Sequence, residues 1–157
     1  MRELVSKLSR LAGQASASFG AFDPSPLLAG GSFELAPTVT EYFQTCIPDL
    51  RLDLECCSIL AAADLIFEHH DLIPSCFCAP RGLISIARQN NGDSFSVDVR
   101  TGKVYLLSHE KYETNAIEPG WNSDLTGFLP ALPVRRENII NTSGATGSTS
   151  RPSSRIC

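Results

Sequence analysis

The densest group of possible metal ligands lies near the middle of this 157-residue chain, at His69, His70, Cys76 and Cys78. Imidazole and thiolate groups both bind zinc, so a small zinc-binding protein is one hypothesis. The spacing argues against it, because a Cys-x-Cys pair chelates a metal less well than Cys-x-x-Cys. We expect the histidines to end a helix and the two cysteines, if they lie on a strand, to face the core together. No cofactor is expected.

Other residues with nucleophilic or acid–base chemistry do not form a recognisable catalytic pattern. A cysteine nucleophile needs a nearby base, and none is evident beside Cys46, Cys56 or Cys57. Asp93 follows a glycine, in a context where aspartate usually bonds its own backbone. The chain also lacks Gly-x-Ser-x-Gly, a P-loop and Gly-x-Gly-x-x-Gly. We expect a protein without a catalytic centre.

Composition favours one globular domain with a mildly acidic surface. Apolar residues make up 43% of the chain and charged residues 19%, with 17 Asp and Glu against 13 Lys and Arg. Basic residues are scattered apart from Arg135 and Arg136, so we do not expect nucleic-acid binding. No run of about 18 apolar residues predicts a membrane span. Without an export signal, the six cysteines suggest reduced thiols in a cytoplasmic protein.

The first third of the chain predicts two helices separated by a loop. Residues 2–18 form an amphipathic pattern whose apolar stripe consists of Leu4, Leu8, Leu11 and Ala15. Residues 19–32 are rich in glycine and proline, which indicates a loop. Thr38 and Glu41 fit a capping box, in which each side chain bonds the other residue's main chain. The helix that they start should end before Pro48.

A strand and a third helix are expected next. Apolar and polar residues alternate over residues 52–57, which is typical of a half-buried strand. Ser58 is suited to cap a helix that runs to about His70. The expected inner face of this helix is Ile59, Ala63 and Ile66.

The strongest pattern is a β-meander between residues 83 and 108. Strands are expected over residues 83–88, 94–99 and 103–108, joined by turns at residues 90–93 and 100–102 that contain glycine. In the second strand, Phe95, Val97 and Val99 alternate with Ser94, Ser96 and Asp98. This alternation predicts one buried face and one solvent face.

The remainder predicts a loop, a short helix and a tail. Residues 118–120 read as loop, and Ser123 is suited to cap a helix that Pro130 ends. Residues 136–157 have little to bury and are expected to be disordered. The predicted architecture is therefore a single α+β domain over residues 1–135, with a central antiparallel sheet, N-terminal and middle helices, and a short C-terminal helix.

The meander resembles the SUKH superfamily, which includes bacterial immunity proteins and a fungal cell-wall assembly regulator. The similarity rests on Leu-Ile-Ser-Ile-Ala at 83–87, Asn-Gly-Asp-Ser-Phe-Ser-Val-Asp at 91–98, Thr-Gly-Lys-Val-Tyr at 101–105 and His-Glu at 109–110. Flanking similarity extends it to residues 30–130. Two departures are the replacement of a glycine-rich stretch at 48–49 and the serine at position 108, where the family tends to have aspartate.

This resemblance implies a protein that binds proteins. Bacterial relatives commonly neutralise a cognate toxin, often a nuclease, and an acidic protein suits a basic toxin domain. The alternative that it implies is a regulatory scaffold of the cell-wall-regulator type. Acidic residues on or beside the meander are the expected partner contacts, namely Asp93, Asp98, Glu110 and Glu113.

Overall fold

The computed structural model describes residues 18–28, 30–72, 75–111 and 117–132. The helix expected over residues 2–18 lies outside this part of the chain except for Ser18, and so does the expected tail over residues 136–157. The α+β class is confirmed for the domain that remains.

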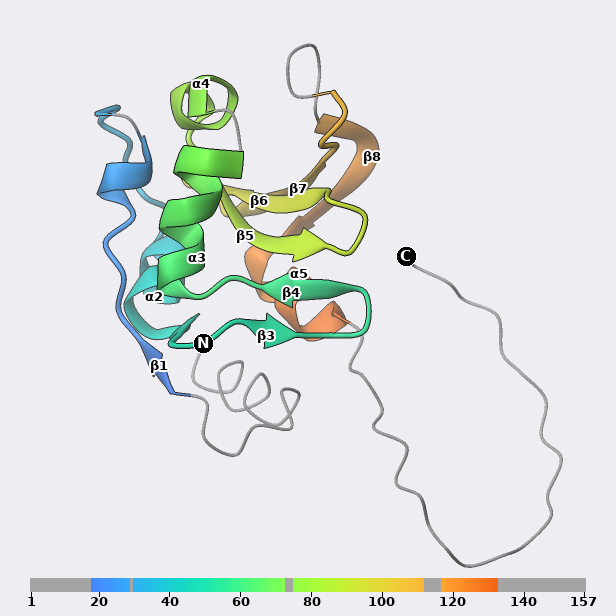
Figure 1. Ribbon diagram of the computed structural model, residues 1–157. Helices are drawn as coiled ribbons and strands as arrows, with labels where there is room; N and C mark the ends of the chain where they lie inside the picture. The colour runs from blue at the N-terminus through green and yellow to red at the C-terminus, as the bar shows by residue number, and fades with distance from the viewer. Residues whose placement is uncertain (1–17, 29, 73–74, 112–116, 133–157) are drawn as a thin grey trace, which may run out of the picture.

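A six-stranded antiparallel sheet forms the centre of the molecule, and each strand pairs with the next one in the sequence (Figure 1). Its strands are β3 (Leu52–Asp53), β4 (Cys57–Ile59), β5 (Leu83–Gln89), β6 (Ser94–Asp98), β7 (Lys103–Leu107) and β8 (Ile117–Asp124). The predicted meander is thus confirmed as β5–β7. A separate two-stranded sheet pairs β1 (Phe19–Gly20) with β2 (Ile47–Pro48).

Helical segments cover both faces of the sheet. In the view of Figure 1, α3 lies in front of the sheet, whereas α2 and α5 lie behind it. The helical segments are η1 (Ser25–Leu28), α2 (Pro37–Thr45), α3 (Ala62–Phe67), the π turn η2 (Glu68–Leu72), α4 (Ser75–Cys78), η3 (Ala79–Arg81) and α5 (Leu125–Ala131). The segment predicted as a loop over residues 19–32 therefore contains β1 and η1.

Both predicted turns of the meander are confirmed, and a glycine with positive φ occupies each. Gly92 has φ +100° and Gly102 has φ +71°, conformations that other residues rarely adopt. Gly102 also lies against α2, since a Cβ there would come 2.7 Å from the Thr38 hydroxyl oxygen. The turn after β6 therefore depends on the helix that packs behind it.

Strand β6 is buried on both faces, so the prediction of a solvent face is wrong. Phe95 contacts the ring of Phe128 on α5, with 4.8 Å between ring centroids. On the opposite face, Ser94, Ser96 and Asp98 are also buried. The Ser96 hydroxyl lies 2.8 Å from that of Ser85, which lets two small polar side chains satisfy each other inside the protein.

The segment after β2 differs from its prediction, because residues 52–59 form a hairpin instead of one strand followed by a helix. Ser58 belongs to β4 and donates to the Asp53 carboxylate rather than capping a helix. Helix α3 begins after Ala61, whose N–H donates to Asp64. The inner residues of α3 and η2 are Leu65, Glu68 and His69. Ala63 and Ile66, predicted to face inward, are exposed.

Three local predictions near helix ends are also corrected. Helix α2 begins at Pro37 and no side chain caps it, so the capping box predicted at Thr38 and Glu41 is wrong. Proline suits the first helical position because the first turn does not need its N–H. Residues predicted as loop, 118–120, belong to β8. Asp124, not Ser123, caps α5 by accepting a hydrogen bond from the Gly127 N–H.

Candidate functional site

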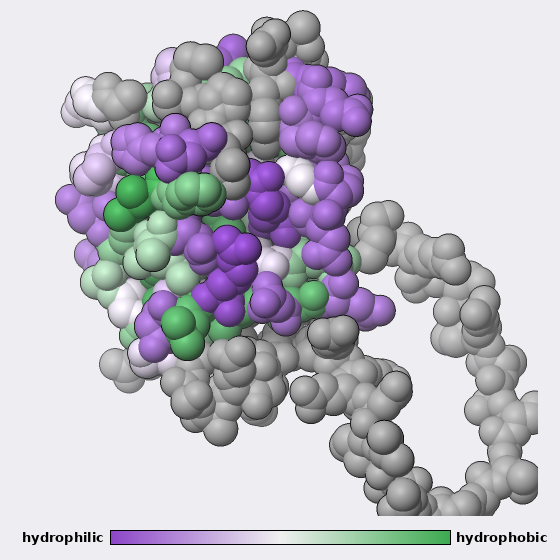
Figure 2. Space-filling view, in the orientation of Figure 1, coloured by the Kyte–Doolittle hydropathy of each residue, from purple (hydrophilic) through white to green (hydrophobic). Residues whose placement is uncertain are grey.

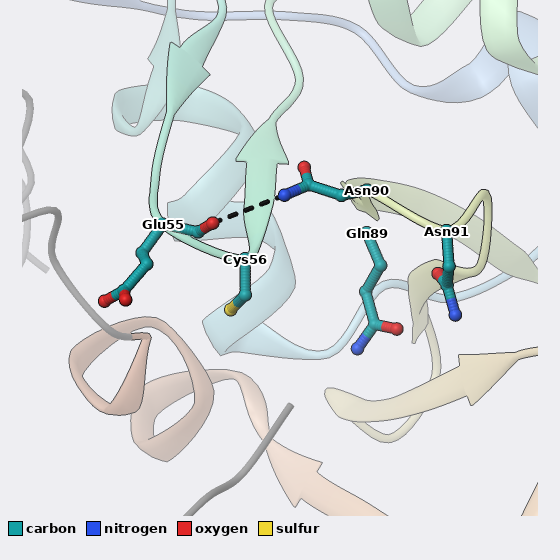
Figure 3. A pocket seen from close by; sticks show the side chains of 5 residues that line it. All are labelled: Glu55, Cys56, Gln89, Asn90 and Asn91. Atoms are coloured by element: carbon teal, nitrogen blue, oxygen red, sulfur yellow. Dashed lines mark hydrogen bonds between the residues drawn. The ribbon is translucent and has the colours of Figure 1, made fainter.

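The turns that follow β3 and β5 are joined at one end of the sheet. The Asn90 main-chain N–H donates to the Cys56 carbonyl at 3.3 Å, and the Asn90 side chain donates to the Glu55 carbonyl at 3.3 Å. Because Gln89 pairs with Cys57 just before this point, the ladder continues into the two turns. Asn90 therefore holds the β3–β4 turn against the β5–β6 turn (Figure 3).

A hollow of about 380 Å³ lies between these turns, lined by Glu55, Cys56, Gln89, Asn90 and Asn91. Figure 3 shows that Cys56, Gln89 and Asn91 direct their side chains toward the same side, with the Glu55 carboxylate beside them. Carboxamides both donate and accept hydrogen bonds, and a carboxylate accepts them or pairs with a cation. This lining suits a polar or basic segment of a polypeptide.

On the other side of the β5–β6 turn, Asp93 contacts His109, which follows β7. The Asp93 carboxylate accepts from the main-chain N–H of His109 at 3.0 Å and lies 2.8 Å from its ring Nδ1. Asn91 donates to the same carboxylate at 3.0 Å. The exposed Glu110 carboxylate lies 4.0 Å from Nε2 of His109. We call the hollow together with Asp93, His109 and Glu110 the turn-end surface.

An ion pair between buried Glu68 and partly buried Arg88 contacts the β5–β6 turn of the turn-end surface. Glu68 on η2 is 1% exposed, and its carboxylate accepts hydrogen bonds from the guanidinium of Arg88 on β5. Arg88 also donates through Nη1 to the Gly92 carbonyl at 2.9 Å. The π turn is thereby connected to the β5–β6 turn through one side chain.

The structure describes three of the four predicted contact residues, and it separates them. Asp93 and Glu110 lie together at the turn-end surface, whereas Asp98 is at the opposite end of β6. The Asp98 side chain is buried and bound to Arg100, so it is not available to a partner. Glu113 lies outside the described residues. The sequence does not predict Glu55 as a contact residue, because its place beside Asn90 depends on a contact between turns 35 residues apart.

Of the His and Cys group, the structure describes the side chains of His69, His70 and Cys78, and these three do not form a metal-binding cluster. His69 is buried, and its Nε2 accepts from the Ser85 N–H at 3.1 Å. Burial, with a smaller effect of neighbouring His70, lowers the pKa of His69 to about 4. His70 is exposed, and Cys78 is buried as expected but on helix α4 instead of a strand.

Cys76 also belongs to α4, although its side chain is outside the described part. Within the ranges that the structure describes, no three His, Cys, Asp or Glu side chains are grouped so that they could hold a metal ion. The zinc hypothesis therefore gains no support from the side chains that can be placed.

Two further findings concern the class of the protein. None of the helices in the described ranges is both long enough and apolar enough to cross a membrane. The assignment to SUKH remains a prediction from the sequence. No protein-family model, curated protein or solved structure matches this chain.

Proposed function

We propose that this chain is a non-catalytic, SUKH-like protein that neutralises a basic toxin domain in the cytoplasm by binding it through the turn-end surface. The observation that carries the proposal is that exposed acidic side chains lie beside two turns whose main chain is held by hydrogen bonds. Glu55 and Glu110 are exposed beside turns that Asn90 and Asp93 hold in place.

Exposed carboxylates increase the rate at which a basic partner is captured, because opposite charges steer the encounter. The carboxamides of Gln89 and Asn91 then offer hydrogen bonds to main-chain or side-chain groups of the partner. Since hydrogen bonds within the protein already hold the two turns in place, these turns lose little conformational entropy on binding. The surface therefore combines electrostatic attraction of the partner with a binding surface that is already ordered.

A direct test uses the protein encoded by the gene adjacent to that of this chain. The expected result is a 1:1 complex in titration calorimetry and loss of the partner's toxic activity when the complex forms. An association rate that falls as salt is raised would further support steering by charge. If no neighbouring product binds, or if binding leaves its toxicity unchanged, the immunity function is rejected.

A further inference from the structure

Helix α3 exposes an apolar stripe where a surface helix usually presents polar side chains. Ile66 is 48% exposed and Phe67 is 50% exposed, whereas Leu65, on the face of α3 that packs against the core, is fully buried. Ala63, one turn before Ile66 and Phe67, is also exposed. Figure 2 shows hydrophobic surface over this helix. The stripe lies outside the turn-end surface and calls for a separate explanation.

Leu50 is a third exposed apolar residue, at 63%, and lies between β2 and β3. The next residue, Arg51, forms an ion pair with Asp64 of α3, with 2.8 Å between nitrogen and oxygen. This pair ties the Leu50 segment to the beginning of α3. Leu50, Ile66 and Phe67 thus belong to neighbouring elements, and we call them the α3 patch.

The chain reaches this region through Ser18, the first residue that the structure describes. The Ser18 N–H and hydroxyl donate to the Asp49 carboxylate at 3.1 and 2.8 Å. In return, the Asp49 N–H donates to the Ser18 carbonyl at 3.0 Å. Because Asp49 precedes Leu50, the residues before Ser18 start beside the α3 patch.

We infer that residues 2–17 cover the α3 patch as an amphipathic helix. Their sequence places Leu4, Leu8, Leu11 and Ala15 on one helical stripe, which supplies an apolar face of its own. Sixteen helical residues extend about 24 Å, more than the roughly 9 Å of the six-residue α3. The segment is therefore long enough to pass along α3 from its anchor at Asp49.

The charges also agree with this occupant. The segment carries Arg2, Lys7 and Arg10 against a single acidic residue, Glu3, and Asp71 is exposed on η2, which directly follows α3 in the chain. The apolar faces of segment and patch bury each other, and the basic side chains remain free to meet acidic groups around the patch. This inference does not depend on the proposed function.

Hydrogen–deuterium exchange of the full chain, read by mass spectrometry, tests the inference. Amides of residues 2–17 should exchange at least about tenfold more slowly than in an unstructured peptide. Leu8→Asp on the segment and Ile66→Asp on α3 should each remove this protection, and circular dichroism verifies that the domain remains folded. Ser9→Asp on the segment and Ala131→Asp on α5 are matched controls that should keep it.

Two results would overturn the inference. Unprotected residues 2–17 in the unmodified chain would show that the segment does not dock. Protection that appears only as protein concentration rises, together with dimers in sedimentation, would assign the α3 patch to a second copy instead.

Discussion

Asp93 binds two nitrogens of the same residue, the main-chain N–H of His109 at 3.0 Å and its ring Nδ1 at 2.8 Å. Burial by itself would raise the pKa of Asp93, but hydrogen bonds from His109 and Asn91 outweigh it and lower this pKa. The carboxylate therefore fixes the β5–β6 turn to the residues that follow β7. This contact gives the turn-end surface its shape.

The substitution Asp93→Ala should lower the free energy of unfolding by about 1–2 kcal/mol, because the hydrogen bonds that the Asp93 carboxylate accepts from His109 and Asn91 are lost together. Asp93→Asn keeps an acceptor for the His109 N–H and should lose less than the alanine variant. Urea denaturation of the three proteins measures the difference. Equal stability of Asp93→Ala and the unmodified protein would show that the contact does not hold the turn.

Gly92→Ala tests the packing of the same turn against His109. A Cβ at Gly92 would lie 3.3 Å from the His109 ring, in a backbone conformation with φ +100°. Gly30, with φ +75° and nothing within 4 Å, is a control for the backbone cost alone. Each change should lower the free energy of unfolding by about 1 kcal/mol, because alanine is strained at positive φ. Gly92→Ala should lower it further, because its Cβ would crowd the His109 ring.

The comparison is made by thermal or urea unfolding of both variants. If Gly30→Ala destabilises as much as Gly92→Ala, contact with the His109 ring contributes nothing to the turn.

Glu68→Ala should destabilise by about 3 kcal/mol, because it leaves the Arg88 guanidinium without its buried partner. The surface pair Arg51–Asp64 is the internal comparison, with side chains 43% and 24% exposed. Arg51→Ala should change stability by less than about 1 kcal/mol. Chemical denaturation measures both; similar losses for the two variants would contradict the structural role of the Glu68–Arg88 pair.

His69 should make stability fall in mild acid. Its folded pKa is about 4, below the usual 6.5, because burial disfavours the charged ring. Between pH 6.5 and pH 4 the His69 ring is protonated in the unfolded chain but stays neutral in the folded protein, so the free energy of unfolding decreases as pH is lowered. The expected loss between pH 7 and pH 5 is about 2 kcal/mol.

His69→Gln, which cannot titrate, isolates this effect while His70 and His109 remain. Urea midpoints at pH 7 and pH 5 should diverge less for the variant than for the unmodified protein. The same pH dependence in both proteins would mean that His69 is not responsible.

Local patterns predicted the meander because its turns depend on residues close in the sequence. Gly92 and Gly102 permit positive φ where two strands reverse, and alternating apolar residues surround both positions. The inner face of α3 could not be predicted in this way. Glu68 and His69 are turned inward by Arg88 and Ser85, which lie 16 to 20 residues later in the chain.

The same limit applies to β6 and to the candidate site. Ser94 and Ser96 have the composition of a solvent face, yet they are buried, and Ser96 finds its partner on β5. Of the acidic residues predicted to meet a partner, Asp93 and Glu110 reach the turn-end surface. Glu55 joins them only through the tertiary contact with Asn90. Such long-range pairings are not visible in local periodicity.

The central claim is that the turn-end surface binds a basic protein, and the dissociation constant of charge-neutralised variants tests it most directly. Glu55→Gln with Glu110→Gln should weaken binding of the adjacent gene's product by at least about tenfold, or 1.4 kcal/mol. Glu34→Gln with Glu41→Gln removes the same charge from exposed positions elsewhere and should change binding little. Equal weakening by the two pairs, or none by the first, would contradict the claim.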